Sequence, residues 1–209
     1  MIYFEKVDKL NITIYFEGGL SFMNTYPMEI AGVKRELPLC KITDDLYIGA
    51  FICFGDAELT VACARELLKL VPQEEYDYLF TAEAKSIPLI HEMARQSGAE
   101  KYFIARKGPK AYMPDPIHVE DQSITTAGVQ KLYLGRDDAD LIRGKRILII
   151  DDVISTGGSL RAMEALVDMA GGTVAGKIAV LAEGDAQTRD DIKFLAPLPL
   201  FNADGTVKE

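Results

Sequence analysis

The chain has 209 residues, of which 48% are hydrophobic, so it is long enough to bury one substantial core. Its formal net charge of −9 argues against a nucleic-acid partner, because phosphate backbones need a basic surface. No apolar run approaches the ~18 residues of a membrane span, and the three cysteines lack zinc-ligand spacing, so we expect a cytoplasmic protein with reduced cysteines and no membrane partner.

The first 55 residues read as short strands separated by turn residues. Strand-like runs cover residues 2–7, 11–17 and 46–54, and the breaks fall at Gly18-Gly19, at Tyr26-Pro27 and at Asp44-Asp45. We therefore expect residues 1–55 to form a small β-rich hood. Residues 56–209 are expected to form the main domain, with a mobile loop at about 107–130.

From residue 56 onward, helical and strand-like patterns alternate. Asp56 is predicted to cap a helix that ends before Pro72. The elements that follow are a strand at 76–80, a helix capped by Ser86 and ended by Gly98, a strand at 102–105, a proline-rich loop at 107–121, strand-like residues 123–134, a strand at 147–150, a helix from Leu160 to Ala170 and a strand at 177–181. This alternation predicts an α/β fold with a doubly wound, mostly parallel sheet.

The most specific motif lies at residues 147–159. An apolar strand runs into Asp151 and Asp152, and then into a turn of hydroxyls and glycines before a helix. Ligands of parallel sheets bind at the carboxyl ends of the strands, where helix N-termini favour phosphate. The two carboxylates can accept hydrogen bonds from vicinal hydroxyls of the sugar that carries the phosphate. The residues of the turn are Ser155, Thr156, Gly157, Gly158 and Ser159.

This stretch resembles the 5-phosphoribosyl-1-diphosphate (PRPP) binding signature of the type I phosphoribosyltransferases. The resemblance implies that Asp151 and Asp152 hold the ribose hydroxyls and that the turn wraps the 5′-phosphate. It extends from about residue 76 to residue 201. A P-loop is excluded, because no Gly-Lys-Ser/Thr ending follows the glycines.

A second turn follows the strand at 76–80 and contains Glu83, Ala84, Lys85 and Ser86. It resembles the diphosphate-binding loop of the adenine and xanthine branch of the family, with Lys85 in place of arginine and Ser86 in place of glycine. Without the resemblance, Lys85 reads equally well as a solvated lysine at a helix start.

Three further cations follow the strand at 102–105. Arg106 and Lys107 come at its carboxyl end, and Lys110 follows three residues later. The resemblance implies that Arg106 and Lys107 reach the diphosphate. On charge pattern alone, the segment also reads as a solvated basic loop.

Together with these motifs, the resemblance implies a magnesium-dependent phosphoribosyltransferase of purine salvage. The resemblance implies transfer of ribose 5-phosphate from PRPP to a nitrogenous base, with adenine favoured, and release of diphosphate. Asp151, Asp152 and Lys85 are the expected catalytic residues, and the other motif residues bind substrate. Mg²⁺ is expected to bind with PRPP rather than through an assigned protein ligand, and the resemblance implies a homodimer.

Three alternatives stay open. Thr126 stands where the adenine enzymes carry a glutamate, which leaves xanthine, hypoxanthine or orotate as other bases and Glu120 or Asp121 as a nearby general acid or base. A non-catalytic PRPP-sensing regulator would keep the same cradle, although no basic DNA-binding face is visible in the sequence. A PRPP-making kinase would also share the turn, but it needs an ATP-binding half for which the chain is short.

Overall fold

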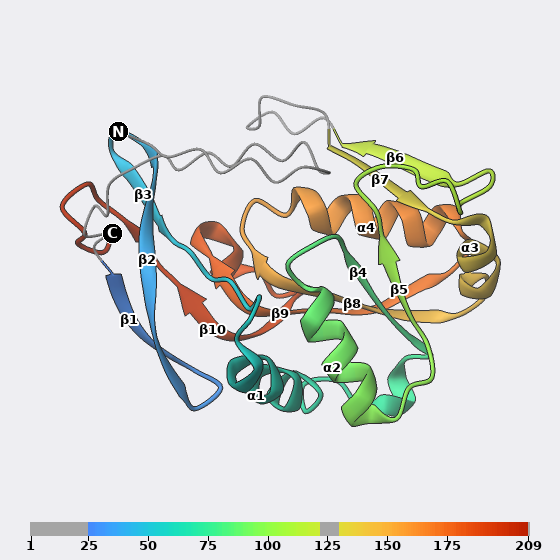
Figure 1. Ribbon diagram of the computed structural model, residues 1–209, viewed down its shortest axis with the longest axis horizontal. Coiled ribbons are helices and arrows are strands. Elements are labelled where there is room, and N and C mark those ends of the chain that lie inside the picture. Colours follow the sequence, from blue (N-terminus) through green and yellow to red (C-terminus); the bar gives the residue numbers. More distant parts are fainter. Residues whose placement is uncertain (1–24, 122–129, 209) are drawn as a thin grey trace, which may run out of the picture.

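The computed structural model describes residues 25–121 and 130–208, which form a mixed α/β fold (Figure 1). Its centre is a parallel five-stranded sheet in the order β10-β9-β8-β4-β5. The strands are β4 (Tyr78–Ala82), β5 (Tyr102–Ala105), β8 (Arg146–Ile154), β9 (Thr173–Glu183) and β10 (Lys193–Leu198). Helices α1 (Ala57–Leu67) and α2 (Ile87–Ser97) lie on one face, and α4 (Gly158–Met169) lies on the other. The predicted doubly wound sheet is confirmed.

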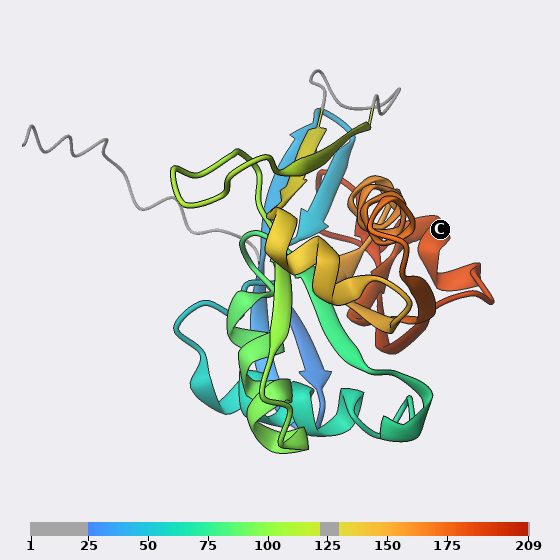
Figure 2. The same ribbon diagram turned by 90° about the vertical axis from the view of Figure 1, so that its right-hand side faces the viewer.

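Alternate residues of β8 supply the two faces of this sheet. Leu148 and Ile150 pack with α1 and α2, whereas Ile147 and Ile149 pack with α4. All four side chains are at most 1% exposed. Burial of each contributes about 1.5–3 kcal/mol, and burial on both faces explains why the strand reads as a continuous apolar run. Figure 2 shows the same layers from the side, with α4 in orange viewed nearly along its axis.

Two of the three predicted helix signals are observed. The Asp56 side chain accepts a hydrogen bond from Leu59 N at 3.1 Å and so caps α1. Gly98 ends α2 in the left-handed conformation, with φ 75°. The third is borne out in position only: Ser86 is the N-cap residue of α2, but its side chain makes no capping hydrogen bond and contacts Asp151 and Asp152 instead.

A second, antiparallel sheet in the order β1-β2-β3-β11 forms the hood. Its strands are β1 (Thr25–Ile30), β2 (Val33–Thr43), β3 (Leu46–Gly49) and β11 (Leu200–Phe201). Arg35 of β2 pairs with Asp56 at 2.6 Å and with Glu58 at 2.8 Å, which ties the β1–β2 hairpin to the start of α1. The hood therefore includes a strand from the end of the chain as well as strands from its beginning.

Tyr26 and Pro27, predicted as a break between strands, lie inside β1. β1 is the edge strand of its sheet, and an edge strand tolerates a proline because one side of it needs no hydrogen-bond partner. The predicted strands at residues 2–7 and 11–17 lie outside the described residues.

The predicted proline-rich loop is shorter than expected. Residues 117–121 form β6 (Ile117–Asp121), which pairs with β7 (Gln130–Leu134) as an antiparallel hairpin that contacts α4. The short helix α3 (Arg136–Ile142) follows and was not predicted. Two 3₁₀ turns complete the elements, η1 (Gln73–Glu75) and η2 (Gly184–Thr188). Among the residues that are described, no helix combines the length and apolar character needed to cross a membrane.

Candidate active site

Asp151 and Asp152 lie within the carboxyl-terminal part of β8, which continues to Ile154 instead of ending before them. Asp152 is 4% exposed, and its backbone N–H donates to Asp151 Oδ1 at 3.0 Å. Burial, followed by the neighbouring Asp152 charge, raises the pKa of the Asp151 carboxyl well above its usual range. Because the two carboxylates lie next to each other in an enclosed site, the pair tends to keep one proton, on Asp151.

The turn after β4 contacts both carboxylates through two consecutive residues. The Ser86 hydroxyl lies 3.0 Å from Asp151 Oδ1 and 3.3 Å from Asp152 Oδ1. Lys85 Nζ lies 2.8 Å from Asp152 Oδ2. Asp152 Oδ2 is buried and accepts no hydrogen bond of acceptable angle from the described residues. Its contact with Lys85 is therefore an ion pair whose geometry does not meet the criteria for a hydrogen bond. The sequence placed these residues in two separate motifs, and the fold brings them into contact.

Two hydrogen bonds hold this region, a buried one from β4 to β8 and a partly buried one from the segment before α1 to the turn. Thr81 Oγ1 donates to the Ile150 carbonyl at 2.7 Å, and Cys53 Sγ donates to the Lys85 carbonyl at 3.0 Å. Burial raises the pKa of Cys53 to about 11, so its thiol is neutral and able to donate. The peptide bond between Glu83 and Ala84 in the same turn is cis. Sequence reasoning gave no role to Cys53 or Thr81, because their partners lie more than thirty residues away.

Glu83 connects the turn after β4 to the cations after β5. Its carboxylate accepts the Lys107 backbone N–H at 3.0 Å and two Arg106 guanidinium hydrogen bonds at 3.2 and 3.3 Å. The Lys107 N–H and then the Arg106 hydrogen bond hold the pKa of Glu83 below its usual range, and the charge of Lys110 lowers it further. An ionised Glu83 therefore orients Arg106 and neutralises part of this cationic edge.

The turn between β8 and α4 holds the predicted phosphate-binding residues. Gly157 has φ 76°, a left-handed conformation that glycine adopts without strain, and α4 begins at Gly158 with no side-chain cap. Arg161 donates to the Thr156 carbonyl at 3.1 Å. A Cβ on Gly157 would lie 2.7 Å from a guanidinium nitrogen of Arg189, so the turn packs closely against that side chain. The uncapped start of α4 suits an anion.

Glu183 and Arg189 border the site, although neither was predicted as a site residue. Glu183 ends β9 and is 7% exposed; burial raises its pKa, while a hydrogen bond with Ser155 and the charge of Lys85 lower it. Arg189 is held by Asp191 through contacts of 2.7 and 2.8 Å. Glu183 was discoverable, because it stands at the carboxyl end of the strand beside β8.

Glu120 is a poor general acid. Its hydrogen bond with Lys131 lowers its pKa, so at neutral pH it is ionised and has no proton to give. Thr126 and the side chain of Asp121 lie outside the described residues.

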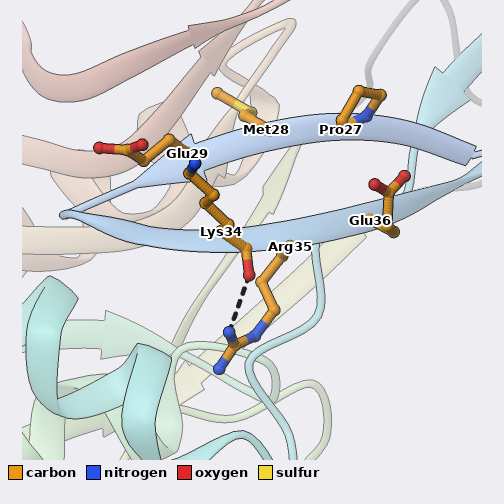
Figure 3. Close-up of a pocket in the computed structure, with 6 residues that line it drawn as sticks. All are labelled: Pro27, Met28, Glu29, Lys34, Arg35 and Glu36. Carbon is orange, nitrogen blue, oxygen red and sulfur yellow. Dashed lines mark hydrogen bonds between the residues drawn. The ribbon is translucent and has the colours of Figure 1, made fainter.

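Three cavities are lined mainly by residues outside the predicted site. One of about 500 Å³ lies on the β1–β2 hairpin, where Figure 3 shows Arg35 pointing away from Glu36. Another of about 290 Å³ lies between the starts of α1 and α2, and a third of about 410 Å³ lies beside β5. Among the described lining residues, Arg106 in the third cavity is the one predicted site residue.

The parallel sheet thus carries an acidic pair, a glycine turn and a cationic turn at the ends of neighbouring strands, which defines an α/β protein with a polar site at that edge. The phosphoribosyl transferase domain model matches residues 59–199, more than half of the chain. The chain therefore belongs to the phosphoribosyl transferase domain family.

Relatives of known name agree with this assignment. An adenine phosphoribosyltransferase of Corynebacterium diphtheriae is 30% identical over 73% of this chain and 79% of that protein. One of Corynebacterium jeikeium is 38% identical, but the match spans 47% of this chain and 45% of that protein. A hypoxanthine/guanine phosphoribosyltransferase of Methanotorris igneus is 30% identical over 59% of this chain and 63% of that protein. The chain thus spans about half the length of the Corynebacterium jeikeium relative and more of the other two.

Solved structures show the same fold. The adenine phosphoribosyltransferase of Rhodothermus marinus superposes with a TM-score of 0.59 at 22% identity, over 84% of this chain and 94% of that chain. The enzyme of Thermoanaerobacter pseudethanolicus gives a TM-score of 0.57 at 22% identity, over 69% of this chain and 83% of that chain.

Proposed function

We propose that this protein is a phosphoribosyltransferase that transfers ribose 5-phosphate from PRPP to a purine base, with adenine favoured, and releases diphosphate. The observation that carries this proposal is the direct contact between Lys85 and Asp152. It places the turn assigned to diphosphate next to the carboxylates assigned to ribose. Neighbouring sites for diphosphate and for ribose hydroxyls fit a single substrate that carries these groups on adjacent carbons.

The acidic pair, the two cations and the glycine turn each have a role in this reaction. The C1–O bond to diphosphate breaks, a base nitrogen forms the new bond to C1, and the sugar is cationic in between. Asp151 and Asp152 accept hydrogen bonds from the ribose hydroxyls and stabilise this positive charge. Lys85 and Arg106 stabilise the negative charge that develops on the diphosphate. The proton of the attacking base nitrogen leaves to solvent, and the glycine turn retains the 5′-phosphate throughout.

Magnesium fits the site as a companion of the substrate. Among residues 25–121 and 130–208, no group of three or more His, Cys, Asp or Glu side chains is placed to hold a metal ion. We propose that the ion is held mainly by oxygens of PRPP, as expected for Mg²⁺ with phosphate ligands. When bound, it offsets the charge of the diphosphate.

We also propose a cytoplasmic homodimer. The three cysteines are free thiols, which agrees with a reducing compartment. The dimer rests on the family resemblance and is tested by sedimentation of the purified protein.

Steady-state kinetics with PRPP, Mg²⁺ and a panel of bases tests the function. We expect adenine to give the highest kcat/KM, because a site built for its exocyclic amino group rejects an oxopurine that reverses the hydrogen-bond pattern. Hypoxanthine or guanine outpacing adenine would transfer the assignment to the oxopurines, for which the Methanotorris igneus relative is the precedent. If PRPP binds but no base reacts, the protein is a PRPP-binding regulator.

A further inference from the structure

Ser86 has an unusual environment for a residue at the start of a helix. It is 1% exposed, it does not cap α2, and its hydroxyl lies between the two carboxylates of β8. The loop motif that this turn resembles has glycine at this place, so the resemblance implies no role for a side chain here. A role for the Ser86 hydroxyl therefore rests on its contacts in this structure alone.

We propose that Ser86 is a positioning residue for the ribose subsite, which holds the Asp151 and Asp152 carboxylates in the orientation that receives the ribose hydroxyls. This inference rests on the proposed function and refines it. The sequence placed Ser86 at the diphosphate end of the substrate, whereas its contacts assign it to the ribose end.

The geometry explains how one hydroxyl serves two carboxylates. Its single proton is donated to Asp151 Oδ1 at 3.0 Å, with Asp152 Oδ1 a second acceptor at 3.3 Å. Lys85 pairs with the other oxygen of Asp152. Both side chains are thus held from the side of the turn after β4, while Asp151 also bonds the backbone N–H and the side chain of Asp152.

The contact between Ser86 and Asp151 also affects the protonation of the Asp151 carboxyl. Among residues 25–121 and 130–208, the charged and titratable groups near the pair include the Lys85 ammonium, the Glu183 carboxyl at the end of β9 and the neutral Cys53 thiol. The hydrogen bond from Ser86 favours the ionised form of Asp151 and so lowers a pKa that burial raises. Without the hydroxyl, Asp151 holds its proton to a higher pH, and a protonated carboxyl accepts ribose hydroxyls less well.

Ser86→Ala removes the donor and tests the proposal by calorimetry with two probes. Ribose 5-phosphate reports on the ribose and 5′-phosphate subsites without a base, and magnesium diphosphate reports on the cationic turn. We expect the variant to bind ribose 5-phosphate about tenfold more weakly at pH 7.5, because a misplaced or protonated carboxyl forfeits about one charge-assisted hydrogen bond to the ribose. Part of the loss is expected to return at pH 8.5, while diphosphate affinity changes less than about twofold.

Ser97→Ala is the matched control, since Ser97 ends the same helix and its hydroxyl donates only to the Ala94 carbonyl among the described contacts. It is expected to leave both affinities and their pH dependence unchanged. Ser86→Gly supplies a second removal of the hydroxyl if the alanine variant does not fold.

Three outcomes decide the matter. Unchanged binding of ribose 5-phosphate in the folded Ser86 variants overturns the positioning role. A loss of diphosphate affinity that exceeds the loss for ribose 5-phosphate returns Ser86 to the diphosphate end and also overturns it. If the wild-type protein binds neither probe nor PRPP, the proposed function itself fails, and this is seen before any variant is compared.

Discussion

Asp151→Asn is expected to stabilise the free protein at high pH. Burial and the Asp152 charge raise the pKa of Asp151 from 3.8 to about 7. A carboxyl whose pKa is higher in the folded chain than in the unfolded chain takes up a proton on folding between these two values. Wild-type stability therefore falls as the pH rises through this window. An asparagine does not titrate, so the variant escapes that loss.

The structure sets the size of the effect. Each pKa unit corresponds to about 1.4 kcal/mol of free energy of unfolding. The full rise gives an upper value of about 4 kcal/mol, and imperfect hydrogen bonding of the amide to Ser86 reduces it, so we expect a gain on the order of 1–4 kcal/mol at pH 8. For a chain of this size, each kcal/mol raises Tm by about 2–4 °C. The gain shrinks towards zero as the pH approaches 4.

Thermal unfolding without ligands, followed by circular dichroism between pH 4.5 and pH 8 in steps of ~0.5 pH unit, measures the difference in stability between the variant and wild type. Asp140→Asn is the control, because Asp140 is a 55% exposed member of an ion pair with Arg143. Its Tm difference from wild type is expected to stay small and flat. A variant at Asp151 that is less stable than wild type at pH 8, or a gain that does not grow with pH, would refute the account of the acidic pair.

Two further predictions concern the anion sites. Lys85→Ala is expected to weaken inhibition by diphosphate tenfold or more, on the basis of about 1.5–3 kcal/mol for a charged hydrogen bond, and to weaken binding of a nucleoside 5′-monophosphate far less. Gly157→Ala forces a side chain into a left-handed conformation at about 1–2 kcal/mol and towards Arg189, so both the free energy of unfolding and the affinity for ribose 5-phosphate are expected to fall.

Each of these predictions has a clear contrary result. Equal losses for diphosphate and for the monophosphate in Lys85→Ala would show that Lys85 is not at the diphosphate end. For the glycine, Gly144→Ala is the control, because Gly144 has φ 69° and nothing within 4 Å of an added Cβ. That variant is expected to lose stability but not affinity. If both glycine variants bind ribose 5-phosphate as well as wild type does, the turn is not the phosphate cradle.

The parallel sheet was predictable because its signals are local. The apolar run at 147–150, buried on both faces, and the caps at Asp56 and Gly98 each depend on neighbouring residues. The end of β8 was not predictable. Asp151 and the residues after it continue to pair with β9, and that backbone pairing overrides the polarity of the carboxylates.

The site was predictable as a set of motifs but not as a set of contacts. The sequence assigned the acidic pair and the turn after β4 to one ligand through the family resemblance. It gave no reason for Lys85 to pair with Asp152, or for Ser86 to leave its helix uncapped. These contacts depend on the lateral pairing of β4 with β8. That pairing brings together residues that lie more than sixty positions apart in the chain.

The central claim is that the β8 carboxylates and the glycine turn bind PRPP for transfer to a base. The most direct test follows diphosphate release from PRPP, Mg²⁺ and adenine by wild type and by the double variant Asp151→Asn with Asp152→Asn. Loss of two charge-assisted hydrogen bonds, at ~1.5–3 kcal/mol each, predicts that wild-type release falls by at least 100-fold in a variant that remains folded. Full release of diphosphate by the double variant would contradict the account.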